Sequence, residues 1–287
     1  MIPFEYLSPE SLDEAVSLLD PEDPDIRPVG GGTAIMLMMK AGVLRPTRLV
    51  SLHRTEARHR QISLGDDGEL HIGGMTTLAA LEHSSLVREG WPVLTRTFRR
   101  LSNVRVRNVA TIGGNLAHAD PHMDMPPVLS ALGARVVAIG PNGKREIAVE
   151  DLCVGYYETV LARNELISEV IVPPMKGGHA AYFKVTTRVA HDWPSLGIAV
   201  AARMEGGKIR DIKLVVGAAT DRPTRLLQAE AQLGGLAPDD TLLGNAGIAA
   251  AKSLNIVSDS HGSSAYKKHL LSIYLGRAVR AAMDSQN

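Results

Sequence analysis

Two glycine-rich segments have the composition that close contact with a phosphate requires. They are Pro28-Val29-Gly30-Gly31-Gly32-Thr33-Ala34 and Ala110-Thr111-Ile112-Gly113-Gly114-Asn115. A pyrophosphate is bound by several backbone N–H groups that point to one place, and glycine permits the positive φ angles and the close backbone approach that this needs. The first segment runs into a predicted helix over 33–40, whose N-terminal amides attract anions, and the second is interpreted as a tight turn at Gly113-Gly114. Together they predict a phosphate-binding cradle for a nucleotide.

Two common nucleotide motifs do not account for these glycines. A Walker A loop places Lys and then Ser or Thr directly after its last glycine, whereas the next lysine here is Lys40. The Rossmann fingerprint G-x-G-x-x-G fails at its third glycine when it is started at Gly30, and it fails at Gly113 as well. The cradle is therefore expected to belong to another nucleotide-binding fold.

A dense cluster of titratable residues follows the second glycine segment. His118, Asp120, His122 and Asp124 fall within seven positions, and Pro121 indicates that they lie in a loop and not on a strand. Imidazoles and carboxylates at this density can bind a metal ion. One interpretation is therefore a metal-dependent hydrolase that uses His118, Asp120 and His122.

Two other interpretations of this cluster stay open at the level of the residues. Asp120 could turn the backbone while Asp124 caps a helix that begins near Met125. Alternatively, Asn115 and Asp124 could bind the hydroxyl groups or the base of a nucleotide whose phosphates lie on the glycines. The last interpretation explains why the cluster comes directly after the second glycine segment.

The overall composition restricts the class of protein. The chain has 287 residues, a hydrophobic share of 45% and 31 basic against 31 acidic side chains, which indicates a folded globular protein. A net charge of zero without a basic stripe argues against nucleic-acid binding. The lone Cys153 cannot form an internal disulfide, a zinc pair or an iron–sulfur cluster with cysteines of this chain alone. Without a secretory signal or an apolar run near the ~20 residues of a membrane span, a cytoplasmic location is expected.

Local patterns predict an α+β chain. Hairpins are expected over 61–72 and 135–149, and helices over 77–87, over 91–101 and from Met125 onward. The segment from Pro173 to Gly178 has the composition of a linker and ends a strand over 169–172. Beyond it we expect strands over 180–187, 196–204 and 208–219 and then helices over 225–233, 242–254 and 264–283. On the last helix the spacing leaves four basic residues for solvent: Lys267, Lys268, Arg277 and Arg280.

The ordered set of motifs resembles a known family. Besides the two glycine segments, the set comprises Ile72-Gly73-Gly74-Met75-Thr76-Thr77, Val106-Arg107-Asn108-Val109, Asp120-Pro121 with Asp124-Met125-Pro126, Gly155-Tyr156-Tyr157-Glu158-Thr159-Val160-Leu161, Lys184, Asp192-Trp193, and Tyr266 with Leu275-Gly276-Arg277-Ala278. In this order the set resembles the FAD-binding medium subunit of the molybdenum hydroxylases. That family includes carbon-monoxide dehydrogenase, nicotine and quinoline dehydrogenases and, as one part of a longer chain, xanthine dehydrogenase. The resemblance covers essentially the whole chain.

The resemblance implies a vanillyl-alcohol-oxidase or PCMH-type FAD-binding fold. In this fold two α/β subdomains hold the dinucleotide, and a C-terminal α+β domain with a small antiparallel sheet and helices closes over the isoalloxazine. The expected divisions are 1–55, 56–176 and 177–287. The implied cofactor contacts are Val29, Gly30, Gly31, Gly32, Thr33, Ala34, Thr111, Ile112, Gly113, Gly114 and Asn115 for the pyrophosphate and neighbouring ribose, Asp124 for the ADP side, and Leu161, Lys184 and Trp193 for the flavin end.

The resemblance also implies an activity. Such a chain is the electron-transfer subunit of an oxidoreductase whose substrate is hydroxylated at a molybdopterin centre on a large partner subunit. Electrons pass through two [2Fe-2S] clusters on a small subunit to the FAD and then to an external acceptor, and the expected assembly is a dimer of heterotrimers. No catalytic base and no metal ligand are demanded of this chain. The alternatives are a nucleotide-binding regulatory or assembly protein without redox activity, and the metal-dependent hydrolase described above.

Two positions depart from the family's pattern. Many relatives carry His-Ser where this chain has Thr33-Ala34, so a hydroxyl contact to phosphate is lost or falls to Thr33, while the backbone donors remain. Trp193 stands where a Tyr often sits, so it can pack against a flavin but offers no hydroxyl. From its residue type alone Trp193 could equally be a core aromatic at a domain seam, and Lys184 could be a surface lysine.

Overall fold

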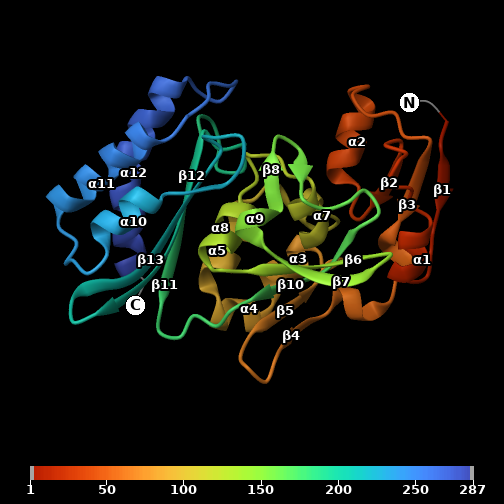
Figure 1. Cartoon of the computed structure of the whole chain (residues 1–287), viewed down its shortest axis with the longest axis horizontal. Coiled ribbons are helices and arrows are strands. Elements are labelled where there is room, and N and C mark those ends of the chain that lie inside the picture. Colours follow the sequence, from red (N-terminus) through yellow and green to blue (C-terminus); the bar gives the residue numbers. More distant parts are fainter. Residues whose placement is uncertain (1–2, 285–287) are drawn as a thin grey trace.

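Three sheets follow one another along the molecule in the computed structural model, which describes residues 3–284. A three-stranded sheet lies at one end, a five-stranded sheet lies in the middle, and a four-stranded sheet with its helices forms the other end (Figure 1). Helices pack against each sheet, and a small two-stranded hairpin completes the structure. The predicted α+β organisation is confirmed.

The N-terminal sheet is parallel, in the order β1-β3-β2. Its strands are β1 (Glu5–Leu7), β2 (Ile26–Val29) and β3 (Arg48–Ser51), with helix α1 (Leu12–Ser17) after β1 and helix α2 (Thr33–Lys40) after β2. Ser11 caps α1 by accepting a hydrogen bond from the amide of Glu14 at 3.0 Å, which satisfies an amide that the helix leaves free. Two short 3-10 helices, η1 (Leu52–Arg54) and η2 (Ala57–Arg60), lead to the middle sheet.

The middle sheet is antiparallel, in the order β4-β5-β10-β6-β7. Its strands are β4 (Ile62–Leu64), β5 (Leu70–Gly73), β6 (Arg135–Gly140), β7 (Gly143–Ala148) and β10 (Leu166–Val172). The two predicted hairpins are therefore present. Around the sheet lie α3 (Leu78–His83), α4 (Ser85–Gly90), α5 (Pro92–Arg100), α6 (Val104–Arg107), α7 (Ile112–Ala117), α8 (Met125–Ala131), α9 (Val149–Leu152) and the hairpin of β8 (Cys153–Gly155) and β9 (Glu158–Thr159).

One helix prediction in this region is wrong. The segment 77–87 forms two helices, α3 and α4, because Ser84 leaves the helical conformation at φ −66°, ψ 126°. Its hydroxyl accepts a hydrogen bond from the amide of Val87 at 3.4 Å. Serine competes with the helical hydrogen bond and is favoured at an N-cap, so it ends one helix and begins the next.

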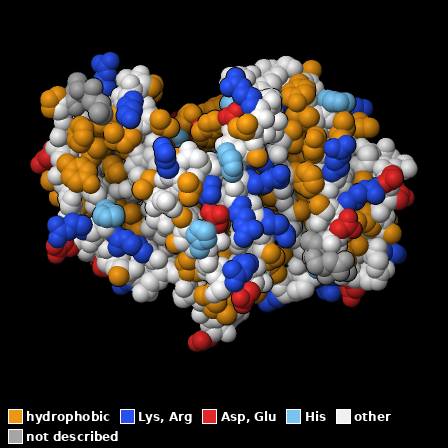
Figure 2. All heavy atoms as spheres, turned by 180° about the vertical axis from the view of Figure 1, so that it is seen from behind, with side chains coloured by type: hydrophobic (Ala, Val, Ile, Leu, Met, Phe, Trp, Pro, Cys, Tyr) orange, Lys and Arg blue, Asp and Glu red, His pale blue; other side chains and the backbone are white. Residues whose placement is uncertain are grey.

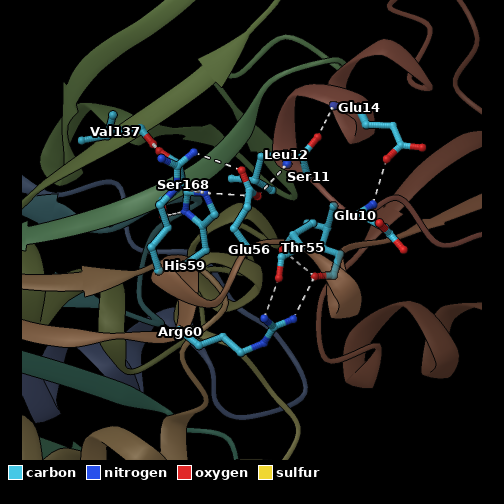
Figure 3. A network of polar contacts seen from close by, with 12 residues as sticks. Glu10, Ser11, Leu12, Glu14, Thr55, Glu56, His59, Arg60, Val137 and Ser168 are labelled. Carbon is cyan, nitrogen blue, oxygen red and sulfur yellow. Dashed lines mark hydrogen bonds and ion pairs between the residues drawn. The ribbon is translucent and has the colours of Figure 1, made fainter.

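Polar contacts join the N-terminal sheet to the middle sheet (Figure 3). The amide of Leu12 donates to the Glu56 carboxylate at 3.0 Å, and the same carboxylate lies 3.6 Å from Nε2 of His59. On its other side the buried His59 ring contacts the carbonyl of Ser168 on β10 at 3.2 Å. Arg58 donates both to Glu56 at 3.0 Å and to Nε2 of His59 at 3.2 Å, so Glu56, Arg58 and His59 together connect α1 to the central strand of the middle sheet.

The C-terminal sheet is antiparallel and is buried on both faces. It comprises β11 (His179–Val185), β12 (Leu196–Glu205), β13 (Lys208–Gly217) and β14 (Thr224–Arg225), followed by α10 (Leu227–Leu233), α11 (Asp240–Ser253) and α12 (Ser264–Asp284). On β12, Ile198 and Val200 belong to the core under α10 to α12, whereas Ala199 belongs to the core shared with α5 and α8. Side chains alternate between the faces of a strand, so a strand covered on both sides is apolar without alternation.

The surface carries mixed charge. On the back face Lys and Arg side chains lie across the middle with Asp and Glu among them, and the outline is hollowed at its upper edge (Figure 2). Over the described residues 3–284, no helix combines the length and the apolar character that crossing a bilayer would take.

Candidate dinucleotide-binding site

The first glycine segment connects β2 to the start of α2. Gly32 is the N-cap of this helix and has a φ of +70°, a left-handed conformation that glycine adopts without strain. Because glycine has no side chain with which to cap, the first amides of α2 stay open to an external acceptor. Thr33 and Ala34 are half-buried on this first turn. The segment thus presents N–H donors as predicted.

The second glycine segment is part of a helix and not a turn. Thr111 is the N-cap of α7, and its hydroxyl accepts a hydrogen bond from the amide of Gly114 at 3.2 Å. Gly113 and Gly114 therefore occupy the first helical turn, which corrects the predicted Gly-Gly turn. The Ser/Thr N-cap rule outweighs the low helix propensity of two glycines here. Gly113 is buried and Gly114 is exposed, so one glycine permits packing and the other permits approach from outside.

The structure brings the two glycine segments into direct contact. A Cβ on Gly31 would overlap the carbonyl oxygen of Val109, and a Cβ on Gly30 would lie 2.7 Å from Oγ1 of Thr111. Side chains at either position would push the segments apart. Residues about eighty positions apart in the sequence thus form one cradle, and α2 and α7 both begin at it.

A third glycine segment, Gly73-Gly74, connects this cradle to the middle sheet. The amide of Gly113 donates to the carbonyl of Gly74 at 2.8 Å, and a Cβ on Gly113 would lie 2.7 Å from that oxygen. Gly74 in turn donates to the carbonyl of Ser168 on β10 at 2.8 Å. The predicted site residues did not include Gly74. Its place in the ordered set of motifs was the available signal, because Gly73-Gly74 repeats the composition of the cradle.

Asn115 carries an unsatisfied acceptor in the cradle. Its amide nitrogen donates to the sulfur of Met123 at 3.2 Å, but its oxygen Oδ1 is buried and has no hydrogen-bond partner among the described residues 3–284. A buried polar atom without a partner destabilises the fold by about 1–3 kcal/mol, so it calls for a donor from outside the chain. A ribose hydroxyl is such a donor, and the residues present therefore fit a nucleotide.

Asp124 makes a buried ion pair across the molecule. Its two carboxylate oxygens accept from the Tyr182 hydroxyl at 2.7 Å and from the Lys184 ammonium at 2.8 Å, both on β11. The carboxylate thus turns to β11 instead of capping α8, and the Lys184 side chain is 4% exposed, not snorkelling on the surface. Burial raises the pKa of Asp124, against the opposing effect of Lys184 and Tyr182. Burial and the neighbouring carboxylate hold the pKa of Tyr182 well above its usual value.

Sequence reasoning missed Tyr182 as the second partner of Asp124. Tyr182 and Lys184 are two positions apart on one strand, so their side chains point to the same face, and that face packs against α5 and α8. The alternation on β11 was the signal that could have found it.

Leu161 and Trp193 lie in two different loops. Leu161 is half-buried against the central core, and its amide donates to the Thr159 hydroxyl at 3.3 Å. Trp193 is 40% exposed and therefore is not a core aromatic. Its ring lies edge-on to His122, with 6.1 Å between the ring centroids. Their contact with a flavin stays a prediction.

The histidine and aspartate cluster does not form a metal site. Asp120 Oδ1 lies 3.1 Å from Nδ1 of His122, and Asp120 Oδ2 accepts from Tyr157, so its ligand atoms are engaged by protein groups. The one convergent group of possible metal ligands within residues 3–284 is Asp67, Glu69 and His71. Glu69 is paired there with Arg135, and His71 with Glu169. The structure thus offers no support for the hydrolase interpretation.

The fold and the joined glycine segments define a nucleotide-binding α+β protein, and comparisons with known proteins specify its family. Residues 2–175 match the family described as "FAD binding domain in molybdopterin dehydrogenase", and residues 181–282 match "CO dehydrogenase flavoprotein C-terminal domain". The chain is 31% identical to the glyceraldehyde dehydrogenase medium chain of Sulfolobus acidocaldarius, over 96% of this chain and 97% of the relative. It is 31% identical to the carbon monoxide dehydrogenase medium chain of Afipia carboxidovorans, over 98% of each.

Solved structures agree with these relatives. A chain of the carbon monoxide dehydrogenase from Hydrogenophaga pseudoflava superposes with a TM-score of 0.94 at 33% identity, over 99% of both chains. Quinoline 2-oxidoreductase from Pseudomonas putida 86 gives a TM-score of 0.92 at 27% identity, over 99% of this chain and 98% of that chain. The chain therefore belongs to the family of FAD-binding medium subunits of the molybdenum hydroxylases. It is an oxidoreductase subunit with the PCMH-type fold that the resemblance implied.

Proposed function

We propose that this chain binds FAD between its two glycine segments and passes electrons from partner iron–sulfur clusters through that FAD to an external acceptor. The contact between Gly31 and Val109 carries the proposal, because it makes one cradle of two distant segments. The open first turn of α2 supplies backbone N–H groups to the pyrophosphate. The amides of the first turn of α7 donate within the chain, so α7 contributes the positive end of its helix dipole, and Asn115 accepts a ribose hydroxyl. A nucleotide-binding protein without redox activity would need the same cradle, but the family assignment favours the electron-transfer function.

The remaining predicted contacts divide along the dinucleotide. Residues Val29 to Ala34 and Thr111 to Asn115 hold the pyrophosphate and its ribose, and Asp124 lies toward the ADP side. Leu161 and Trp193 lie toward the isoalloxazine, which the C-terminal domain covers. Lys184 pairs with Asp124 at 2.8 Å, so it lies beside Asp124 and not, as the resemblance implied, at the opposite end of the cofactor. When bound, FAD accepts single electrons and can release two together, while the protein sets its orientation and surroundings. The chain then acts as three units, 1–55, 56–176 and 177–287.

The assembly that we propose is a dimer of heterotrimers with a small iron–sulfur subunit and a large molybdenum subunit. The small subunit carries two [2Fe-2S] clusters, and the large subunit carries molybdopterin and the substrate site. The single cysteine of this chain supports this division, since it cannot ligate a cluster alone. Several relatives are named as medium chains, which is consistent with two further subunits. Co-purification from the native source would test the assembly.

The absorption spectrum of the purified chain tests the cofactor. Absorption bands at about 370 and 450 nm, the positions of a flavin, are expected. Denaturation of the chain should release FAD. Gly114→Val should abolish these bands, because Gly114 is exposed at the cradle and a side chain there would fill it. Its Cβ would lie 2.9 Å from the Thr111 hydroxyl that caps α7, so urea unfolding of the variant checks that its fold is retained. Gly90→Val is the control, at a helix end outside the cradle. A colourless wild-type chain, or full flavin in Gly114→Val, would refute the site.

A further inference from the structure

His122 has a carboxylate at each ring nitrogen. Its Nδ1 lies 3.1 Å from Oδ1 of Asp120 in the same loop, and its Nε2 lies 3.0 Å from Oδ2 of Asp259, in the segment before α12. The His122 side chain is 16% exposed. The ring therefore bridges the loop that follows the cradle to the C-terminal domain.

This geometry requires both ring nitrogens to carry protons. An ionised carboxylate only accepts hydrogen bonds, so a nitrogen that faces one must donate. Burial disfavours the imidazolium, but the two carboxylates outweigh burial and raise the pKa of His122. His59 provides the contrast, because its Nε2 accepts a hydrogen bond from Nε of Arg58 at 3.2 Å, and burial lowers its pKa. His122 is thus the charged histidine of the two.

The bridge extends on both sides into a longer network. The hydroxyl of Tyr157, between β8 and β9, donates to Asp120 at 2.9 Å. At the other end the ammonium of Lys267 pairs with Asp259 and donates to the carbonyl of Ala218 at 2.6 Å. Lys267 was predicted to face solvent, but it is fully buried on α12.

Backbone strain is concentrated around the same loop. Ala119, Tyr157 and Ala218 have φ angles of 51°, 57° and 62°, which are left-handed values at residues other than glycine. Hydrogen bonds join them to the loop, from the amide of Tyr157 to the carbonyl of Ala119 at 3.0 Å and from Ala218 to Pro121 at 2.8 Å. A residue held in such a conformation is strained and persists only where its surroundings fix it. The position of His122 is therefore strongly determined.

The bridge lies between the predicted cofactor contacts. His122 follows Asn115 by seven residues and precedes Asp124 by two, and its ring contacts Trp193 edge-on. The His261 ring packs beside it, with 5.0 Å between the ring centroids. Any movement of His122 thus changes both the loop that leads to Asp124 and the ring contact that positions Trp193.

We propose that His122 is a positioning residue whose charged imidazolium, held between Asp120 and Asp259, fixes the C-terminal domain on the cradle loop and seats Trp193 over the bound flavin. The proposal rests on the FAD site proposed above. Loss of the imidazolium proton removes the hydrogen bond from His122 to one of the two carboxylates. This loosens the contact between the C-terminal domain and the loop over 118–124, so bound FAD is released faster at higher pH. Three titratable groups contact the His122 ring directly: Asp120, Asp259 and His261. The titratable and charged groups in the next layer are Tyr156, Tyr157, His118, Asp221 and Lys267.

The rate of FAD release as a function of pH tests the bridge. The full chain is loaded with FAD, diluted, and followed by the fluorescence of released flavin. Wild-type release should accelerate about tenfold as pH rises through the pKa of His122. His122→Gln should release FAD at the fast rate at every pH and still bind one FAD at saturation. In Asp120→Asn the acceleration should move to lower pH, because one of the two carboxylates that stabilise the imidazolium is gone.

A titration without flavin separates this proposal from the proposed function. The Cε1–H proton resonance of His122, assigned by its absence in His122→Gln, should titrate above the ordinary histidine pKa of about 6.5 and shift downward in Asp120→Asn. His83→Gln, an exposed histidine at the end of α3, is the control and should match wild type in both experiments. A wild-type chain that binds no FAD would refute the FAD site alone. An ordinary or lowered pKa, or a wild-type pH profile of release in His122→Gln, would overturn the bridge.

Discussion

The backbone of Gly31 lies against the carbonyl group of Val109 so closely that a Cβ at Gly31 would overlap the carbonyl oxygen. Gly31 precedes α2 in the N-terminal unit, and Val109 precedes α7 beside the middle sheet. The close approach brings the N-termini of both helices to the same cradle. Glycine is needed at this position for packing between units, in addition to any contact with a ligand.

Gly31→Ala is expected to lower the free energy of unfolding by about 1–3 kcal/mol, the cost of forcing an extra methyl group into a packed site, and to abolish FAD binding. Urea unfolding and FAD titration by fluorescence check the two effects. Gly244→Ala on α11 is the matched control, since no described atom lies within 4 Å of a Cβ there. It should stabilise the chain by roughly 0.5–1 kcal/mol through helix propensity. Normal FAD affinity in Gly31→Ala would show that the segments do not form one cradle.

Lys184→Met should destabilise the chain by about 3–5 kcal/mol, because it leaves the buried Asp124 carboxylate without its cation. Loss of the ammonium raises the pKa of Asp124 further. A raised pKa in the folded chain destabilises the fold wherever the unfolded carboxyl is ionised, so the deficit should be largest above the raised pKa of Asp124 and shrink as pH falls from there toward the ordinary Asp pKa of about 3.9. Urea unfolding at several pH values measures it. Lys252→Met, at an exposed position of α11, should change little, and a deficit independent of pH would contradict the role of the pair.

The sequence was informative where a local rule determines the structure. The predicted strands and helices of the C-terminal part are present because the apolar runs there are long, and the two hairpins are present because their turns carry glycine. The glycine segments were predicted to form a cradle from composition alone, and their contact with a cofactor stays a prediction. The contact between the two segments could not be predicted from the residues, since the close packing of Gly31 on Val109 depends on how two distant units pack.

Predictions from residue type or helical spacing failed where a specific polar contact outweighs them. Thr111 draws Gly113 and Gly114 into a helix through its N-cap bond, although two glycines favour a turn. Lys267 has the helical spacing of a solvent-facing residue, but Asp259 and the Ala218 carbonyl give its ammonium buried partners. Asp124 likewise turns from its own helix to Lys184. In each case a specific polar partner outweighs the local preference. For Asp124 this partner is 60 residues away in the chain, whereas Asp259 is eight residues from Lys267 and Thr111 is three from Gly114.

Trp193→Ala is expected to weaken FAD binding by about 1–3 kcal/mol, the range for loss of one aromatic ring stacked on a base. Trp193→Tyr, which keeps an aromatic ring, should retain most of the affinity. Val189→Ala is the control in the same loop, because Val189 is 63% exposed and lies outside the predicted contacts. Equal affinity of Trp193→Ala and wild type in an FAD titration would place the flavin end elsewhere.

Cys153 should resist thiol reagents in the folded chain and react only on unfolding. Its side chain is buried, and burial raises the pKa of its thiol to about 11, so at about pH 8 only roughly one thousandth of it is the reactive thiolate. Because it is the single cysteine, the colour released by a disulfide reagent reports this site alone, and concentrated urea should expose one thiol per chain. The double variant Cys153→Ser, Val154→Cys moves the thiol to a 40% exposed neighbour and should react rapidly without urea. Rapid reaction of the native wild-type chain would show that the β8–β9 hairpin, which also carries Tyr157, opens in solution.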